Sequence, residues 1–312
     1  MTFDKAYCEE LKGNVTAYKA RREYFSQDNA SLKFSFFCPD ENCNADLTSV
    51  NIYTIGKVSH KPHFRTRRNH NHSDDCSIIQ NVEEIKVGTK NKEGHGNSHG
   101  QKNSKYPEEF ILNRPKSEID STSKKDIDDD FDIEPRQRRQ ATRGLAEEAR
   151  PHKTSYLENV VDGYEDMSVQ DMKDTFLILG GDRKSYNNSF KKIQYFEDGK
   201  NFIFYGDIEP IQEFGKNYAI RFKEKAWFEG KPYHVSMYLT KVLIDNYRLC
   251  RLFKESITEF VKLGNNFKSA KCYFVGSYPE LKEVPTKDGK SSFNVLDIHI
   301  ENLDHLVIKF TV

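Results

Sequence analysis

Two stretches decide the fold of about the first quarter of the chain: Phe37-Cys38-Pro39-Asp40-Glu41-Asn42-Cys43 and His70-Asn71-His72-Ser73-Asp74-Asp75-Cys76. Zinc binds cysteine sulfur and histidine nitrogen, usually four ligands at the corners of a tetrahedron. The first stretch offers two cysteines on a tight turn after a strand. The second offers a histidine and a cysteine one helical turn apart at the start of a helix. The spacing therefore predicts a Zn2+ site formed by Cys38, Cys43, His72 and Cys76.

Several histidines lie near this site, so the identity of its fourth ligand has an alternative. Four of the 10 histidines, His60, His63, His70 and His72, lie within thirteen positions. His70 is the substitute for His72 as the fourth ligand, whereas His63, beside Phe64, is expected to pack or to support a ligand. A site closed by four protein ligands is structural, because catalytic zinc keeps an open position. The competing interpretation is a surface loop with incidental histidines.

Composition limits the classes of protein to consider. The 312 residues suffice for two modest domains, and the formal net charge of +0 excludes a global field that would drive the chain onto nucleic acid or membrane. Charged residues make up 31% of the chain, and the mean hydropathy is -0.79. The sequence contains neither an apolar run of about 20 residues nor the hydrophobic region of a signal peptide. We therefore expect a soluble, cytoplasmic protein.

The distribution of polar and apolar residues predicts an α+β protein in three parts. Residues 1–86 form a small, β-rich zinc-binding module. Residues 87–152 read as a flexible charged linker, because such a segment cannot bury enough apolar area to offset its chain entropy. Within it, residues 106–112 are an apolar island expected to dock on a domain or on a partner. Residues 153–312 combine a helical lead-in with an OB-like β-barrel.

The order of elements in the C-terminal part carries the barrel prediction. Strands are expected at 200–214, 218–228 and 233–244, then a helix at 249–261, then strands at 271–276 and 293–300, with 306–311 extending the last strand or adding a sixth. Three strands, a helix and two strands is the order of an OB-fold, although other small barrels share parts of it. Gly206 lies inside the first strand, which suits the sharp coil that this strand requires.

Strand 218–228 alternates between two kinds of side chain. Tyr218, Ile220, Phe222 and Glu224 fall on the face expected to point inward, which leaves Arg221, Lys223, Lys225 and Trp227 outside. OB-folds bind single strands by stacking bases on aromatic rings while cations follow the backbone. The pattern predicts nucleic-acid contacts at these four outer residues. The alternative is that the aromatic residues fill the barrel and the lysines are only solvated.

A second basic arm lies beside the predicted metal site. It runs from Lys61 to Arg68 and contains Arg65, Arg67 and Arg68. Guanidinium groups contact phosphates readily. These three arginines are therefore further candidates for nucleic-acid contact.

The N-terminal motifs resemble those of a known family. Residues 13–20, Phe37-Cys38-Pro39, Cys43, Pro62-His63-Phe64-Arg65 and the His72/Cys76 pair are similar to the zinc-binding region of the competence protein CoiA family, over residues 10–76. The cysteine turn departs from the pattern, with four intervening residues instead of the usual two. The resemblance implies a zinc module of bacterial DNA-handling proteins.

The resemblance also implies a nuclease domain of the restriction-endonuclease type, which the downstream sequence does not supply. The acidic pairs Asp132/Glu134 and Asp207/Glu209 are not followed by a strand ending in Glu-x-Lys at sensible spacing. No nucleophile triad, P-loop or dinucleotide-binding loop is present either. The sequence therefore favours a non-enzymatic nucleic-acid-binding protein of a bacterial DNA-handling or defence system. Two alternatives stay open: a protein-interaction adaptor, which the neutral net charge favours, and a metal-dependent nuclease.

Overall fold

The computed structural model divides the chain into two compact units, each treated by itself. It describes residues 2–26, 33–40, 42–43, 45–55, 60–67, 71–73, 76, 79, 106–112, 133–134, 153–198, 201–277, 279–285 and 291–311. Of the described residues, unit 1 contains those in 2–54, 60–79 and 133–134, and unit 2 contains 55, 106–112 and those in 153–311. The predicted mixed class of helix and sheet is confirmed.

Unit 1 is built on one antiparallel sheet with the order β1-β6-β5-β4-β2-β3-β8. Its elements are β1 (Thr2–Phe3), β2 (Lys5–Cys8), β3 (Gly13–Thr16), α1 (Ala17–Ser26), β4 (Phe36–Phe37), β5 (Asp46–Val50), β6 (His63–Thr66) and β8 (Ile133–Glu134). β2 and β3 form a hairpin whose turn lies at residues 9–12, and Gly13 begins its second strand.

Aromatic side chains and one buried arginine hold unit 1 together. The rings of Phe36 and Phe64, on β4 and β6, lie 4.8 Å apart in a core that also receives Ala20 of α1. From the same helix, Arg21 donates to the backbone carbonyl oxygens of Asn51 and Thr54, at 2.7 and 2.6 Å. Because a buried guanidinium must be hydrogen-bonded, these contacts fix the chain that follows β5.

Unit 2 begins with a four-stranded sheet of order β11-β10-β7-β9. Its elements are β7 (Glu109–Phe110), β9 (Lys153–Thr154), α3 (Leu157–Asp166), α4 (Val169–Asp174), β10 (Phe176–Leu179), β11 (Asp182–Ser185) and α5 (Tyr186–Ser189). The predicted helical lead-in contains α3, which buries Leu157, Val160 and Val161. This helix is capped at Tyr156 without a side-chain hydrogen bond.

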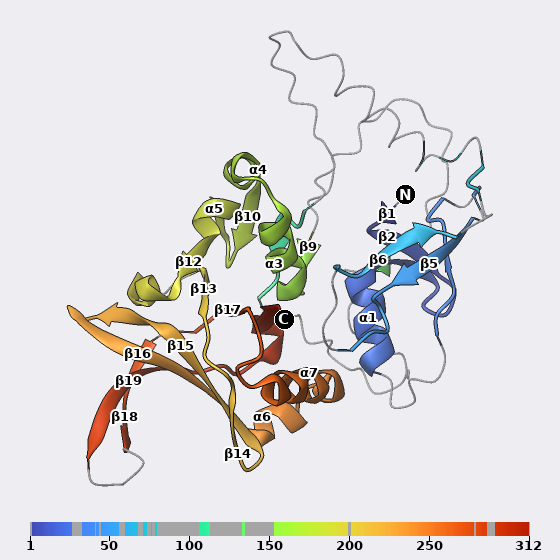
Figure 1. Cartoon of the computed structure of the whole chain (residues 1–312). Helices are drawn as coiled ribbons and strands as arrows, with labels where there is room; N and C mark the ends of the chain where they lie inside the picture. Colours follow the sequence, from blue (N-terminus) through green and yellow to red (C-terminus); the bar gives the residue numbers. More distant parts are fainter. Residues whose placement is uncertain are drawn as a thin grey trace, which may run out of the picture. The chain divides into compact units, whose positions relative to one another are not determined.

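The rest of unit 2 contains two sheets, β12-β13-β17-β20 and β14-β15-β16-β19-β18, and the second is curled into a half-barrel (Figure 1). The elements are β12 (Phe190–Lys192), η1 (Ile193–Asp198), β13 (Ile203–Asp207), β14 (Gln212–Phe214), β15 (Asn217–Phe228), β16 (Lys231–Leu239), α6 (Lys241–Asp245), α7 (Cys250–Leu263), β17 (Ser269–Phe274), β18 (Pro279–Pro285), β19 (Ser292–Ile298), η2 (Leu303–His305) and β20 (Leu306–Thr311).

One hydrophobic core lies between these two sheets. It joins Phe204 and Phe274 of the first sheet to Phe222 and Met237 of the second, with Phe260 of α7. An isolated bridge between Ile208 and Phe222 connects the sheets directly. None of the helices in the described part of the chain is long and apolar enough to cross a membrane.

The strands differ from the sequence expectation in several places. The strand expected at 200–214 is two strands, β13 and β14, which belong to different sheets and are separated by residues 208–211. The strand expected at 233–244 ends at Leu239, and residues 241–245 form the helix α6 instead. β18 was not expected, because its side chains are largely exposed and show no apolar alternation. The segment 306–311 adds a strand, β20, which pairs with β17.

Two pieces of the predicted linker are described, and each contributes a two-residue strand, β7 and β8. Residues 106–112 belong to unit 2, where β7 pairs with β10 and β9. Residues 133–134 pair with β3 of unit 1. The apolar island, residues 106–112, thus docks on a domain, which is one of the two outcomes expected from the sequence. The linker boundaries at residues 87 and 152 stay a prediction.

Gly206 is required by close packing, which gives a stability prediction. A Cβ atom there would lie 2.8 Å from Cγ2 of Ile193 and 2.9 Å from Cδ1 of Phe222, both buried. We expect Gly206→Ala to destabilise unit 2 by about 1–3 kcal/mol, the usual cost of overpacking. Urea unfolding measures this, with the exposed Lys173→Ala as a control expected to change stability by less than about 0.5 kcal/mol. Equal unfolding midpoints for wild type and Gly206→Ala would contradict the packing argument.

Candidate functional site

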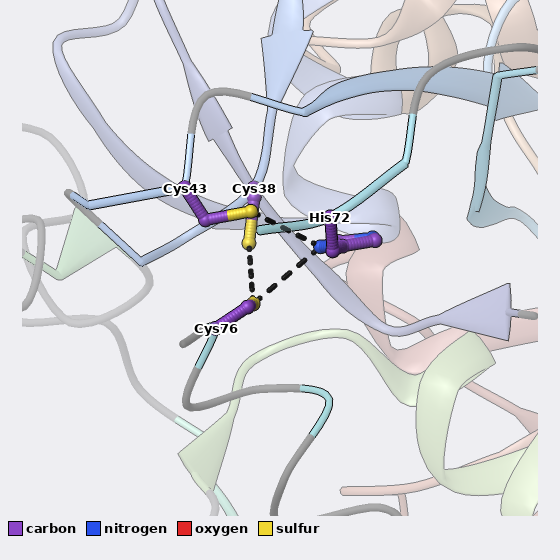
Figure 2. Close-up of side chains that lie close together, drawn as sticks. All are labelled: Cys38, Cys43, His72 and Cys76. Atoms are coloured by element: carbon purple, nitrogen blue, oxygen red, sulfur yellow. Dashed lines mark hydrogen bonds between the residues drawn. The ribbon is translucent and has the colours of Figure 1, made fainter. Parts of the chain in front are cut away.

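The four predicted metal ligands come together in unit 1. The sulfur atoms of Cys38, Cys43 and Cys76 and a ring nitrogen of His72 all lie within 4.8 Å of one another (Figure 2). The three cysteines are buried, with at most 1% of their surface exposed. This cluster can hold a metal ion. Among the residues that the structure describes, it is the one such group of three or more histidine, cysteine or acidic side chains.

The first ligand pair is held by a turn at the end of β4. The backbone N–H of Cys38, the residue after that strand, donates to Ala45 O at 2.9 Å. The N–H of Cys43 donates to Asp40 O at 3.0 Å, and the Asp40 carboxylate accepts from the N–H of Asn42 at 3.0 Å. These bonds close the turn and hold both sulfurs on one side of it.

The second ligand pair lies on irregular backbone. The described residues 71–73 and Cys76 are not helical, so the expected helix start was wrong at these positions. A turn replaces it, in which the N–H of Cys76 donates to Ser73 O at 2.9 Å. The His72 ring packs on Phe3, with the ring centroids 5.2 Å apart. His70, the alternative ligand, lies outside the described residues.

The electrostatics of the cluster depend on burial. Burial raises the pKa of the Cys38 thiol, and the neighbouring Cys76 and Cys43 raise it further. Burial acts in the same direction on Cys43, but hydrogen bonds from the backbone of Ala45 and Ser73 and from the side chains of Cys76 and Ser73 together lower the pKa of that thiol. A cation among the sulfurs favours the thiolate forms, because a positive charge opposes the effect of burial.

The two nitrogens of the His72 ring have different partners. Nδ1 lies 3.3 Å from Cys43 Sγ and 3.5 Å from Cys76 Sγ, so it faces the cluster. Nε2 lies 3.4 Å from the hydroxyl oxygen of Thr66, at the end of β6. Burial lowers the pKa of His72, which favours the neutral ring that binds metals. Thr66 was missed from the sequence, because no local pattern brings it next to His72.

The predicted outer face of strand 218–228 is observed on β15. Arg221, Lys223 and Lys225 are exposed, and Trp227 is 55% exposed, whereas Phe222 is buried. The ladder between β15 and β16 shifts register between Arg221 and Lys225. Within the described residues, none of the three cations is paired with a carboxylate, so their charges face solvent.

Strand β16 adds groups to this face that the sequence argument did not assign. His234 lies directly opposite Lys225, and Ser236 lies opposite Arg221. The exposed Tyr238, 45% accessible, continues the same row. Alternation along β16 places these three side chains on one face, but only the register puts them beside the cations of β15.

The basic arm is described up to residue 67. Arg65 on β6 is exposed, whereas Arg67 lies 3.6 Å from the carboxylate of Asp46. Arg68 lies outside the described residues. Its role stays a prediction.

The molecule thus offers two chemically distinct features. One is a buried Cys3His cluster suited to holding a metal ion, and the other is an exposed row of cations and aromatic rings on β15 and β16. Comparison with protein-family models, with curated proteins and with solved structures finds no match to this chain.

Proposed function

We propose that this chain is a non-enzymatic nucleic-acid-binding protein, in which a structural Zn2+ ion holds the N-terminal module and an OB-like barrel binds a single strand. The observation that carries the proposal lies on one face of β15: three exposed cations that pair with no carboxylate among the described residues, and an exposed tryptophan. A bacterial DNA-handling or defence system is the proposed setting, on the strength of the motif resemblance at residues 10–76 alone.

The spacing of the ligand atoms supports zinc. A tetrahedral ion with Zn–S bonds of about 2.3 Å separates two sulfurs by about 3.8 Å, and a sulfur and an imidazole nitrogen by about 3.5 Å. The Sγ atoms of Cys38 and Cys76 lie 3.7 Å apart. His72 Nδ1 lies 3.3 and 3.5 Å from the sulfurs of Cys43 and Cys76. Four protein ligands close the coordination shell, which favours a structural role.

The contact between His72 and Thr66 gives a prediction for metal affinity. A metal on Nδ1 leaves Nε2–H to donate to the Thr66 hydroxyl, which orients the ring. Thr66→Val keeps the shape but removes the acceptor, so we expect about 10-fold or greater weakening of zinc binding. Competition with a chromophoric chelator measures it. Thr48→Val on β5 is the control and Thr66→Ser the rescue. If all three variants bind zinc as tightly as the wild type, Thr66 does not orient the His72 ring as proposed.

The strand pairings of unit 2 support an OB-like barrel. β14 pairs with β15, β15 with β16, β16 with β19, and β19 with β18. β18 follows β17 along the chain, and β17 pairs with β13, which leads into β14. Within this series, β16 and β19 form the parallel pair. Such a series agrees with a five-stranded Greek-key barrel, whose second and third strands bind oligonucleotides in OB-folds.

A binding assay over a salt series tests the proposal. The zinc-loaded full chain is titrated into labelled single-stranded DNA, duplex DNA and single-stranded RNA. We expect single strands to bind and to lose affinity as salt rises, with a slope of about -2 if three phosphates are neutralised. If none of the three nucleic acids binds, the result would favour the alternative function, a protein-interaction adaptor. Cleavage of the labelled strand in Mg2+ would favour the nuclease.

One observation favours the adaptor as a second candidate. The hairpin of β18 and β19 exposes Leu281 and Phe293, with 41% and 44% of their surfaces accessible. The register pairs Leu281 with Leu296 and Phe293 with Val284, so the two exposed side chains lie on opposite faces of the hairpin, and each offers an apolar contact to a partner by itself. Cross-linking in a lysate, with Phe293→Ser as the variant, tests this candidate separately from nucleic-acid binding.

A further inference from the structure

We propose that unit 2 contains a groove between β9 and β10 that binds an extended peptide strand, and that the chain's own residues 106–112 occupy it. The segment reads Tyr106-Pro107-Glu108-Glu109-Phe110-Ile111-Leu112. We call it the strap. This inference concerns a site separate from the metal cluster and from the cation face of β15, so it does not depend on nucleic-acid binding.

The strap is held first through its backbone. Glu109 and Phe110 pair with Ile178 and Leu179 of β10 on one side, and the same two residues pair with β9 on the other. The N–H of Ile178 donates to Glu108 O at 2.7 Å. Both ladders are parallel, and a parallel pair cannot be closed by a hairpin turn. The strap is thus inserted as a separate strand, as peptides are in sheet augmentation.

Side chains on alternate positions give the groove its selectivity. Phe110 is only 2% exposed and packs in the core formed by α3 and β10. Glu109, on the other face, lies 2.8 Å from the ammonium of Lys153. Tyr106 packs against α3, where a Cβ atom on Gly163 would lie 3.3 Å from its ring. The absent side chain at residue 163 therefore makes room for the aromatic ring.

Two further side chains hold the ends of the strap. The hydroxyl of the buried Tyr186 donates to Pro107 O. At the other end, His305 Nε2 lies 2.9 Å from Leu112 O. Because a carbonyl oxygen only accepts, the histidine donates. His305 also lies against Phe110, with ring centroids 6.1 Å apart.

Every group that recognises the strap comes from residues 153–312. Lys153, Gly163, Ile178, Tyr186 and His305 form the groove, and residues 113–152 separate the strap from the first of them. All of these groups thus lie outside the strap itself, although β9, an edge strand, pairs with no described strand other than β7. The ligand class of the groove is an extended peptide with an aromatic residue followed by proline, an acidic residue before a buried phenylalanine, and a leucine two residues later.

A peptide added in trans tests the groove. The full chain carrying Phe110→Asp should release its strap, because a carboxylate cannot be buried in that core. A labelled, capped peptide of residues 106–112 should bind this variant, and bind wild type at least about 10-fold more weakly, because the tethered strap competes at high effective concentration. The same peptide with Phe110→Asp should bind neither. Adding Tyr186→Phe to the Phe110→Asp chain should weaken its binding of the peptide. Adding the exposed Tyr195→Phe instead is the control and should leave this binding unchanged.

A second experiment covers the case in which Phe110→Asp does not fold. Specific protease sites are inserted in the wild-type full chain on both sides of the strap, and the cut protein is passed through gel filtration. Retention of the cut strap, with exchange for labelled peptide, supports the proposal. Retention without any exchange would make the strap a permanent strand of the fold, and immediate loss would mean that the groove does not bind it. Failure of the peptide to bind a folded Phe110→Asp chain overturns the proposal as well.

Discussion

Replacement of Cys43 by alanine is expected to abolish stoichiometric zinc binding and to unfold unit 1. The remaining Cys38, His72 and Cys76 leave the shell incomplete. Zinc contributes about 10–16 kcal/mol to folding in small zinc domains, whereas whole domains are stable by only about 5–15 kcal/mol. Loss of the ion therefore removes most or all of the stability of the module.

Elemental analysis and unfolding curves measure this result. Cys8→Ala is the matched control, because Cys8 is buried in the same unit but belongs to a different core cluster from the ligands. It should keep its zinc. The single tryptophan, Trp227, lies in unit 2, so its fluorescence reports that unit alone. Its unfolding transition should stay unchanged. Full zinc content in Cys43→Ala would contradict the ligand assignment.

Joint replacement of Arg221, Lys223 and Lys225 by alanine is expected to remove most of the affinity for single-stranded nucleic acid. Each cation that neutralises a phosphate releases counterions, so the slope of log affinity against log salt should become shallower by about 2. The three side chains are exposed and make no carboxylate pairs in the described part of the chain, so stability should change little. Fluorescence anisotropy across a salt series measures both quantities.

Trp227→Ala separates stacking from charge. A stacked base contributes about 1–3 kcal/mol, so affinity should fall while the salt slope stays constant. The control for the cation variant replaces three basic residues of α7 by alanine: Arg251, Lys254 and Lys262. It removes the same formal charge from another part of unit 2. If nucleic-acid binding survives both changes on β15, we would instead assign the contact surface to the basic arm that contains Arg65 and Arg67.

The sequence determined the features that depend on local spacing. Two short ligand pairs identified Cys38, Cys43, His72 and Cys76, because a metal site built from turns is encoded within a few residues. The period of two along residues 218–228 placed Arg221 and its neighbours outside. A strand with one buried face must alternate in this way. The helix expected at 249–261 corresponds to α7 for a similar reason, because an amphipathic helix repeats its apolar residues with a period near 3.6.

Only the tertiary structure decided which distant segments meet. Thr66 faces His72, His234 lies opposite Lys225, and the strap enters a sheet whose other strands begin at residue 153. The sequence suggested Gly206 for a sharp coil of its strand, and the structure adds its close packing against Ile193. None of these contacts follows from periodicity. Strand register and side-chain packing are set by many long-range contacts acting together, and each becomes favourable only when the whole core is assembled.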